Sequence, residues 1–366
     1  MSVHTPHPDL PPPANIVGVV GWSRANLFSS PLHTLLSLFA LYLVYLIVPP
    51  IINWVFIDST WVGDTREACA TTTGACWVFV KVRFNQFMYG FFPQAEYWRI
   101  NLAFLLLIAL AIPLFIKSFQ HKGKLAAFIL IFYPIITFQL FSGGHFGLSH
   151  VETSKWGGLS LTLILAGVGI VASLPLGIVL ALGRRSNMPI VKSVCVVFIE
   201  FWRGVPLITV LFMSSVMLPL FLPEGTNFDK LLRAMIGIAL FQSAYMAEVV
   251  RGGLAAIPKG QYEAAEALGL SFWKSMGLII LPQALKLVIP GIVNTFIALF
   301  KDTTLVLIIG LFDLLAIIQQ AFADPDWLGF SIEGYVFAAS IFWIFCFSMS
   351  RYSMALEKKL HTGHTR

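Results

Sequence analysis

The chain has 366 residues, of which 57% are hydrophobic and only 11% are charged, and its mean hydropathy is +0.81. A soluble domain needs a far more polar surface, and the long uninterrupted apolar stretches exclude a transmembrane β-barrel, whose strands would alternate. The net charge of +6 comes from basic residues in short segments between apolar stretches, so it gives no reason to expect nucleic-acid binding. Composition therefore predicts an all-α polytopic membrane protein embedded in a lipid bilayer.

The chain is predicted to begin with a disordered polar tail at 1–30 in place of a signal peptide, because its first residues are the Pro-rich "MSVHTPHPDLPPPAN". Eight apolar stretches follow, most of them near the ~20 residues that a membrane helix needs. These predicted spans are Leu35–Ile57, Ile100–Ile116, Leu125–Phe141, Leu159–Leu182, Val194–Leu222, Leu231–Val250, Ala284–Ile309 and Gly334–Ser350. All charged residues that fall inside a span belong to the last five spans, and the first three spans contain none. We therefore expect a three-helix N-terminal extension at 31–154, a five-helix core at 155–356 and a second tail at 357–366.

Lysine and arginine set the predicted orientation of the spans. Alternate loops are rich in basic residues, namely "KSFQHKGK", "GRRSNMPIVK", the segment Arg251–Lys274 and the tail from Arg351. The loops between them carry most of the acidic residues. Because basic loops stay on the cytoplasmic side of a membrane, both termini are predicted to be cytoplasmic.

Two cysteines lie close together in the longest loop on the opposite side, in the segment "CATTTGAC". The predicted topology places Cys69 and Cys76 in an oxidising compartment, which favours a disulfide over two free thiols that are merely close in sequence. No histidine or further cysteine lies nearby, so we predict no metal site there. Cys195 and Cys346 fall inside predicted spans and are interpreted as small core residues.

A polar segment, "EAAEALGLSFWKSMGLIILP" from Glu263 to Pro282, interrupts the apolar sequence within a predicted cytoplasmic loop. Its beginning predicts a short helix. Ala265 and Gly269 are four residues apart and are expected on one small-residue face, with Ala264 beside them, which another protein surface could approach closely. The alternative interpretation is an ordinary alanine-rich loop helix.

The spacing of this segment resembles the EAA motif of permease subunits in ABC importers. The matching positions are Glu263, Ala264, Ala265, Gly269, Ile279, Leu281 and Pro282. The segments "IEFWRGVPLITVLF", "FQSAYMAEVVRGGLAAIPKGQYEAA" and "NTFIALFKDTTLVLIIG" resemble the polar amino-acid, HisMQ-like branch of that superfamily, over about 155–356. The first three spans, with "REACATTTGACW", resemble the N-terminal extension of the M-type subunit of general L-amino-acid (Aap/Bzt) transporters.

The resemblance implies a type I permease core that carries polar L-amino acids across a bacterial inner membrane by alternating access. It also implies three partners: an ATP-binding subunit on which the EAA helix docks, a second permease subunit in a heterodimer, and a periplasmic amino-acid-binding protein. The chain has no P-loop pattern, because Gly123-Lys124 is followed by Leu125 and lacks the upstream glycine. We therefore expect no enzymatic activity and no cofactor in this chain, with ATP and Mg used by the partner ATPase.

Charged residues inside the spans are the candidates for the translocation path. Glu200 and Arg203 are three residues apart in "IEFWRGVP" and can pair on one helix face, after which Gly204 and Pro206 can break the helix. A passage for a zwitterion needs both signs of charge, and the candidates that could supply them or line the path are Glu200, Arg203, Lys301, Asp302, Thr303 and Thr304. The alternative is that these charges pair within the protein and only hold helices together.

The sequence leaves two other classes of function to consider. An ion-gradient-driven secondary transporter could use Glu200, Asp302 or Glu248 as an ion site, but such folds often carry inverted repeats and none is evident. A membrane-embedded enzyme would need catalytic or metal-ligand spacing, and the eight histidines lie mostly in tails and loops. The preferred prediction is the ABC importer permease.

Overall fold

The structure is a computed structural model, which describes residues 18–71, 73–116, 118–145, 147–223 and 228–360. The chain divides into two compact units, residues 1–78 and residues 79–366, and each is considered by itself. The described residues are predominantly helical, and their one short strand, β1 (Phe312–Asp313), has only two residues. The predicted all-helical fold is therefore confirmed.

The α-helices are α1 (Gly18–Asn26), α2 (Pro31–Ile52), α3 (Trp77–Tyr89), α4 (Tyr97–Phe115), α5 (Lys122–Ser142), α6 (Gly158–Arg184), α7 (Pro189–Gly204), α8 (Leu207–Phe212), α9 (Lys230–Ala256), α10 (Lys259–Ala267), α11 (Phe272–Ser275), α12 (Leu281–Leu287), α13 (Ile289–Asp302), α14 (Leu314–Phe322) and α15 (Ser331–Leu360). Several continue into tighter or wider turns. Those of the π type are Asn53–Ile57, Met213–Met217 and Met276–Ile280, and those of the 3₁₀ type are Arg66–Cys69, Gln94–Glu96, Thr153–Lys155, Leu218–Phe221, Thr303–Ile309 and Pro325–Trp327.

In the first unit, α2 is an apolar helix with none of its residues buried. The Ser30 side chain caps its first turn by accepting a hydrogen bond from the backbone N–H of His33, and Pro31 follows in the first helical turn, where its missing N–H costs nothing. With the π turn to Ile57, it forms a candidate span of 27 residues. Its exposed apolar surface is what contact with lipid requires.

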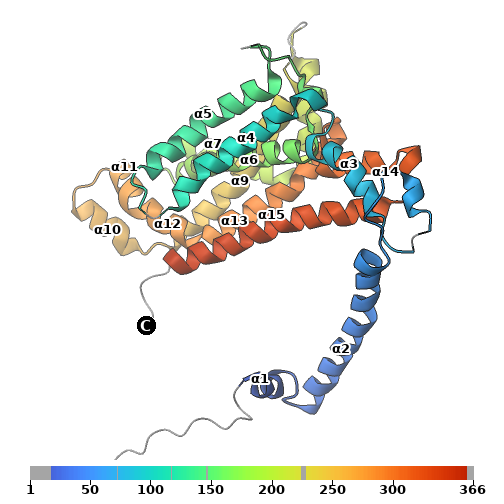
Figure 1. The fold of residues 1–366 in the computed structure, drawn as a ribbon. Coiled ribbons are helices and arrows are strands. Elements are labelled where there is room, and N and C mark those ends of the chain that lie inside the picture. Colours follow the sequence, from blue (N-terminus) through green and yellow to red (C-terminus); the bar gives the residue numbers. More distant parts are fainter. Residues whose placement is uncertain (1–17, 72, 117, 146, 224–227, 361–366) are drawn as a thin grey trace, which may run out of the picture. The chain divides into compact units, whose positions relative to one another are not determined.

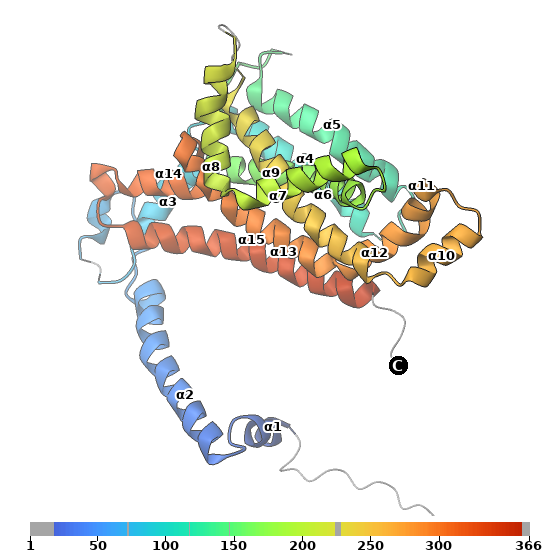
Figure 2. The same cartoon turned by 180° about the vertical axis from the view of Figure 1, so that it is seen from behind.

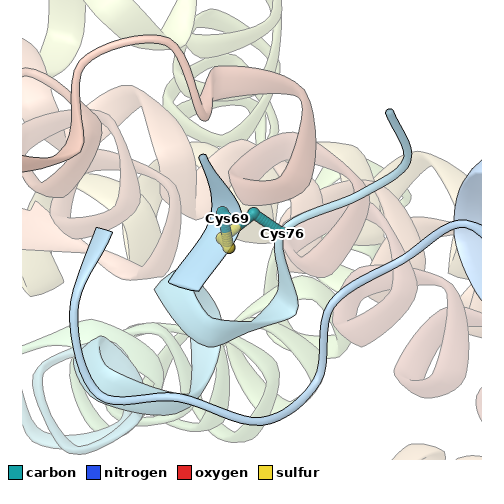
Figure 3. The surroundings of a disulfide bond; sticks show 2 residues. All are labelled: Cys69 and Cys76. Atoms are coloured by element: carbon teal, nitrogen blue, oxygen red, sulfur yellow. A yellow bond between two sulfur atoms is a disulfide. The ribbon is translucent and has the colours of Figure 1, made fainter. Parts of the chain in front are cut away.

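A disulfide-closed loop follows α2 (Figure 3). Cys69 and Cys76 are joined by a disulfide, with their Cα atoms 5.8 Å apart. Backbone hydrogen bonds between Thr60 and both Ala75 and Trp77 hold the loop closed, and the Trp77 indole N–H donates to the Val55 carbonyl at 2.8 Å. The loop is thus held by a disulfide, by backbone hydrogen bonds and by a hydrogen bond from the Trp77 indole.

In the second unit, α6 and α9 form the centre of the bundle. Small residues allow the two helices to approach closely: a Cβ added at Gly177 would lie 2.7 Å from the Met246 side chain and 3.0 Å from the Ala247 nitrogen. This is how membrane helices associate, since lipid provides no hydrophobic drive between them. Buried apolar residues form two clusters. One surrounds the first halves of α6 and α9, and the other surrounds Met246, which is fully buried.

Part of the predicted extension lies in this second unit as well. Arg99, at the start of α4, is 1% exposed and donates from Nη1 to the Ser149 carbonyl at 2.8 Å and from Nη2 to its hydroxyl at 2.9 Å. Arg99 Nε also lies 2.8 Å from a Glu96 carboxylate oxygen. These contacts of the buried guanidinium tie α4 to the segment that leads into α6.

The predicted span Val194–Leu222 is not one continuous helix. The chain bends by 102° between α7 and the helix that begins at Leu207. Val205 leaves the helical conformation, and Pro206 cannot continue the hydrogen-bond ladder of α7. The helix therefore breaks between Gly204 and Leu207, at the position predicted from Gly204 and Pro206.

The count of eight spans is not confirmed. The described part of the chain contains six helices that are long and apolar enough to cross a membrane, or seven if the bent pair counts as one. The helix missing from that set is α9, predicted as the span Leu231–Val250. It contains Arg233, Gln242 and Glu248, whose side chains are buried or nearly buried within the protein.

The ends of the bundle differ. Both views show α10 and α11 at one end, where α15 also finishes, and α14 at the opposite end (Figure 1, Figure 2). The EAA segment is thus outside the packed helices, as a surface that a partner can reach.

Candidate functional site

The EAA segment begins with α10, for which Pro258 occupies the position before the first turn. Glu263, Ala264 and Glu266 are exposed, whereas Ala265 is only 1% exposed and is buried within this chain. The helix therefore presents a polar and small-residue surface outward and uses Ala265 to hold itself against the protein.

Gly269 ends this helix instead of extending its face. Its φ of +71° lies in the left-handed region that favours glycine, and its N–H donates to the Glu266 carbonyl at 2.8 Å. The Leu270 N–H donates to the carbonyl of Ala265 at 3.2 Å, which completes the turn. The predicted common face of Ala265 and Gly269 is wrong, because one residue is buried and the other lies beyond the end of the helix.

Tyr262 anchors α10 to two helices of the bundle. Its hydroxyl donates to the Leu254 carbonyl in α9 at 3.0 Å and accepts from Arg185, just after α6, at 3.2 Å. The Arg185 guanidinium also lies 5.5 Å from the centre of the Tyr262 ring. Tyr262 therefore links α10 to both α6 and α9.

The second half of the motif connects α10 to the core. Ile279 lies in the π turn Met276–Ile280, and Leu281 opens α12 with Pro282 in the first turn, where its missing N–H costs little. Ile279 and Leu281 pack against the buried cluster around Met246. The Gln283 amide also donates to the Gln261 side chain of α10 at 3.1 Å.

Large exposed apolar side chains surround α10. Leu268 is 75% exposed, Trp273 is 73% exposed and Leu278 is 72% exposed. Exposed apolar residues gathered at one end of a protein mark a surface for a partner or a membrane.

An arginine–glutamate network joins α6, α7 and α9 beside this anchor. Glu248 lies 3.0 Å from Arg184, 3.5 Å from Arg203 and 2.8 Å from Arg251, and its side chain is 16% exposed. Arg184 also lies 2.8 Å from Glu200. Among the ion pairs of the described residues, none joins Glu200 to Arg203, so the pairing within one helix predicted from their spacing is replaced by pairing between helices.

The other candidate path residues lie at the end of α13. Lys301 is exposed and Asp302 is half-buried, and the helix tightens into a 3₁₀ turn from Thr303. Thr303 is fully buried and donates to the Phe300 carbonyl at 2.8 Å, while Thr304 donates to the Lys301 carbonyl at 2.9 Å. No ion pair within the described ranges links this group to the network around Glu248.

The sequence alone does not single out Arg184, and it suggests Glu248 only as an ion site of the alternative, ion-driven carrier. In the sequence Arg184 is one of several basic loop residues, whereas in the structure it ends α6 and pairs with both Glu200 and Glu248. The network could have been predicted from the positions of these charges along three predicted spans. Arg184, Glu200 and Glu248 all lie near the end of their span that is predicted to face the cytoplasm.

Comparison with known proteins identifies residues 173–362 as a binding-protein-dependent transport system inner membrane component. The chain is 61% identical over 359 residues to the inner membrane amino-acid ABC transporter permease protein YhdY of Escherichia coli (strain K12), with 98% of each chain covered. It is 41% identical over 422 residues to the glutamate/glutamine/aspartate/asparagine transport system permease protein BztC of Rhodobacter capsulatus, with 97% of this chain and 96% of that protein covered. Among solved structures, the crystal structure of an amino acid ABC transporter with histidines shares 30% sequence identity and a TM-score of 0.49, over 55% of this chain and 92% of that chain.

These relatives confirm the predicted family over nearly the whole chain, including the part that precedes residue 173. Members of this family are multi-span inner membrane permeases, and ATP hydrolysis belongs to a separate subunit, as expected from the missing P-loop pattern. The family also implies an ATPase and a binding protein as partners. The chain belongs to the binding-protein-dependent inner membrane components, as a permease subunit of the ABC transporter family.

Proposed function

We propose that this chain carries polar L-amino acids across the inner membrane by alternating access, driven by an ATP-binding subunit that docks on α10. The observation that carries the proposal is the construction of α10: an exposed polar helix anchored through Tyr262 to both α6 and α9. Two relatives of high coverage support the substrate class, because one is named for amino acids and the other for glutamate, glutamine, aspartate and asparagine.

The coupling role is assigned to the EAA residues Glu263, Ala264, Ala265, Gly269, Ile279, Leu281 and Pro282. Glu263 and Ala264 form part of the outer surface, Ala265 seats the helix, and Gly269 makes the turn toward α11. Closure of two ATP-binding subunits would then move α10, and Tyr262 would pass the movement to α6 and α9.

The ion-pair network around Glu248 lies on the same helices, α6 and α9, to which Tyr262 would pass the movement of α10. It holds α6, α7 and α9 together by ion pairs rather than by apolar packing alone. Ion pairs can exchange partners when helices move, whereas close-packed apolar contacts resist sliding. For Glu200 and Arg203 this pairing supports a structural role. Lys301, Asp302, Thr303 and Thr304 remain the proposed path-lining group.

The finer topology is also part of the proposal. Eight spans result if the bent α7–α8 pair and α9 are both counted with the six apolar helices. Three would form the extension at 31–154 and five the core at 155–356, with tails at 1–30 and 357–366 and both termini cytoplasmic. This orientation places the loop closed by Cys69 and Cys76 in the periplasm, where a disulfide persists.

The proposed assembly contains a second, different permease subunit, two ATP-binding subunits that use ATP and Mg, and a periplasmic amino-acid-binding protein. The comparisons give no support to an ion-gradient-driven carrier.

The test is to purify the tagged chain from its native host and to assay ATP hydrolysis with and without binding protein and amino acid. We expect Glu263→Lys to insert normally but to lose the co-purifying ATPase, because it reverses a charge on the exposed surface of α10. Glu357→Lys, at the exposed end of α15, is the matched control. A Glu263→Lys variant with full ATPase coupling would refute the docking role of α10.

A further inference from the structure

A large apolar groove opens between the broken helix and α9. Its volume is about 700 Å³, and it is lined from one side by α7, α8 and the turns that follow α8, and from the other by the first half of α9. The lining is almost wholly apolar or aromatic, and its polar side chains are those of Thr209, Ser214 and Arg233. The transport mechanism proposed above makes no use of it.

Arg233 is the unusual member of this lining. It is 8% exposed, and its Nε and Nη1 atoms are buried without a hydrogen-bond partner in the described part of the chain. Among the described residues that line the groove, none is acidic. Two unpaired charged donors in an apolar place are costly, so the groove is built for something that supplies an anion.

The lining also limits what else the ligand can contain. A zwitterionic amino acid would bring an ammonium group that needs an acceptor. Among the described residues, the hydroxyls of Thr209 and Ser214 are the side-chain acceptors that line the groove, and neither carries a negative charge to pair with an ammonium. An anion with a long apolar body fits this lining better than a polar amino acid does.

The position of Arg233 indicates which anion. It is the fourth residue of α9, a helix of 27 residues, and at about 1.5 Å per residue it lies within roughly 6 Å of the helix end. The length of such a helix is about the thickness of a bilayer including its headgroups. The first turn of α9 is therefore expected at the depth of the lipid phosphates. The groove is open there, since Phe221 is 77% exposed and Phe228 is 47% exposed.

We propose that this groove binds one phospholipid, with its phosphate on the Arg233 guanidinium and an acyl chain along the apolar lining. A guanidinium offers two parallel N–H donors to a phosphate, and Nε with Nη1 is one such pair. The acyl chain fills space that would otherwise be left open between α8 and α9. The bound lipid would then be a part of the folded permease at the point where α7 and α8 bend. This site is independent of the substrate that the transporter carries.

The test uses the full chain, purified with the subunits that co-purify with it and stripped of lipid in detergent. Palmitoyl-oleoyl phosphatidylglycerol is added back, and the phospholipid retained per complex is counted by native mass spectrometry. We expect Arg233→Gln to weaken lipid retention about tenfold, which is the effect of losing one charge-assisted hydrogen bond. Lipid retention by Arg233→Lys should be between that of the wild type and that of Arg233→Gln. Gly237→Leu, which places a side chain in the groove, is expected to weaken retention as well.

Lys230→Gln is the matched control, because Lys230 is exposed, three residues earlier on the same helix, and carries the same charge. It should leave retention unchanged. Inorganic phosphate alone should not displace the lipid, since it lacks the acyl chain. Equal retention in wild type and Arg233→Gln would overturn the proposal.

Two further outcomes would assign Arg233 to a different partner and would also overturn it. One is loss of a co-purifying permease chain in Arg233→Gln while lipid retention stays the same, which would place Arg233 at a protein interface. The other is increased retention in Glu224→Gln, which would show that this glutamate, in a segment outside the described residues, neutralises Arg233.

Discussion

Glu248 offers the sharpest test of how the bundle is held together. The substitution Glu248→Gln keeps the size of the side chain and removes its charge, which leaves Arg184, Arg203 and Arg251 without their shared carboxylate. Glu248 and Arg184 are 16% and 24% exposed, so their ion pair at 3.0 Å is largely shielded from water. Arg203 and Arg251 are 36% and 43% exposed, so their pairs are partly screened.

The expected loss of stability follows from that exposure. Each of the two screened pairs contributes about 0.5 kcal/mol, as exposed ion pairs do. The pair with Arg184 is closer to a buried one, for which removing one partner costs more, and we assign it about 1 kcal/mol. The total is about 2 kcal/mol, which corresponds to a fall of about 4 °C in the melting temperature of a domain of this size.

The assay is the melting temperature of the purified complex, followed by size-exclusion chromatography after heating. Glu357→Gln is the control, because Glu357 is exposed near the end of α15. In a double-mutant cycle, Arg184→Gln should remove less stability from Glu248→Gln than from wild type, since the two side chains share one interaction. A melting temperature within about 1 °C of wild type, or additive effects in the cycle, would refute the reasoning.

The remaining predictions concern a buried acid, a close helix contact, an anchor and a disulfide. Burial raises the pKa of the Asp313 carboxyl to about 6, although it accepts from the backbone N–H of Ala316 at 3.0 Å. Its stability contribution is therefore full below its unfolded pKa of about 4 and is lost as pH rises to the folded pKa of about 6, by on the order of 2 to 3 kcal/mol. Asp313→Asn should flatten the fall of the melting temperature between about pH 4 and 6, and an unchanged slope would contradict this. Gly177→Ala should lower the melting temperature by forcing α6 from α9 at a cost of about 1 to 3 kcal/mol, while Gly167→Ala, where nothing lies within 4 Å, should not. Tyr262→Phe should keep the ring but lose both hydroxyl hydrogen bonds, and is expected to reduce substrate-stimulated ATPase without loss of assembly; unaltered stimulation would remove Tyr262 from the coupling route. Cys69→Ser should abolish the mobility shift that reduction produces on a non-reducing gel, and a shift that persists would exclude the Cys69–Cys76 bond as its source.

Much of this protein was determined by its sequence alone. Long apolar stretches in a chain with 11% charged residues predict membrane-spanning helices. Lipid offers no hydrogen-bond partner to backbone N–H and C=O groups, and a helix satisfies these groups internally. The EAA spacing identified the family because seven positions between Glu263 and Pro282 match its motif, and the comparisons confirmed that family. Even the break near Gly204 and Pro206 was foreseeable, since proline acts on its own local backbone.

What the tertiary structure decided concerns partners that are distant in the sequence. Spacing suggested that Glu200 would pair with Arg203 on one helix, but the bundle brings Arg184 to Glu200 and Glu248 to Arg203. Spacing likewise placed Ala265 and Gly269 on one face, whereas packing buries Ala265 and a left-handed turn removes Gly269 from the helix. Helical periodicity predicts which residues share a face, but only packing decides whether that face meets a neighbouring helix, lipid or a partner. For the same reason, nothing in the sequence distinguishes Arg233 from the other basic residues near span ends. Its burial without a partner among the described residues arises only when α8 and α9 pack around it.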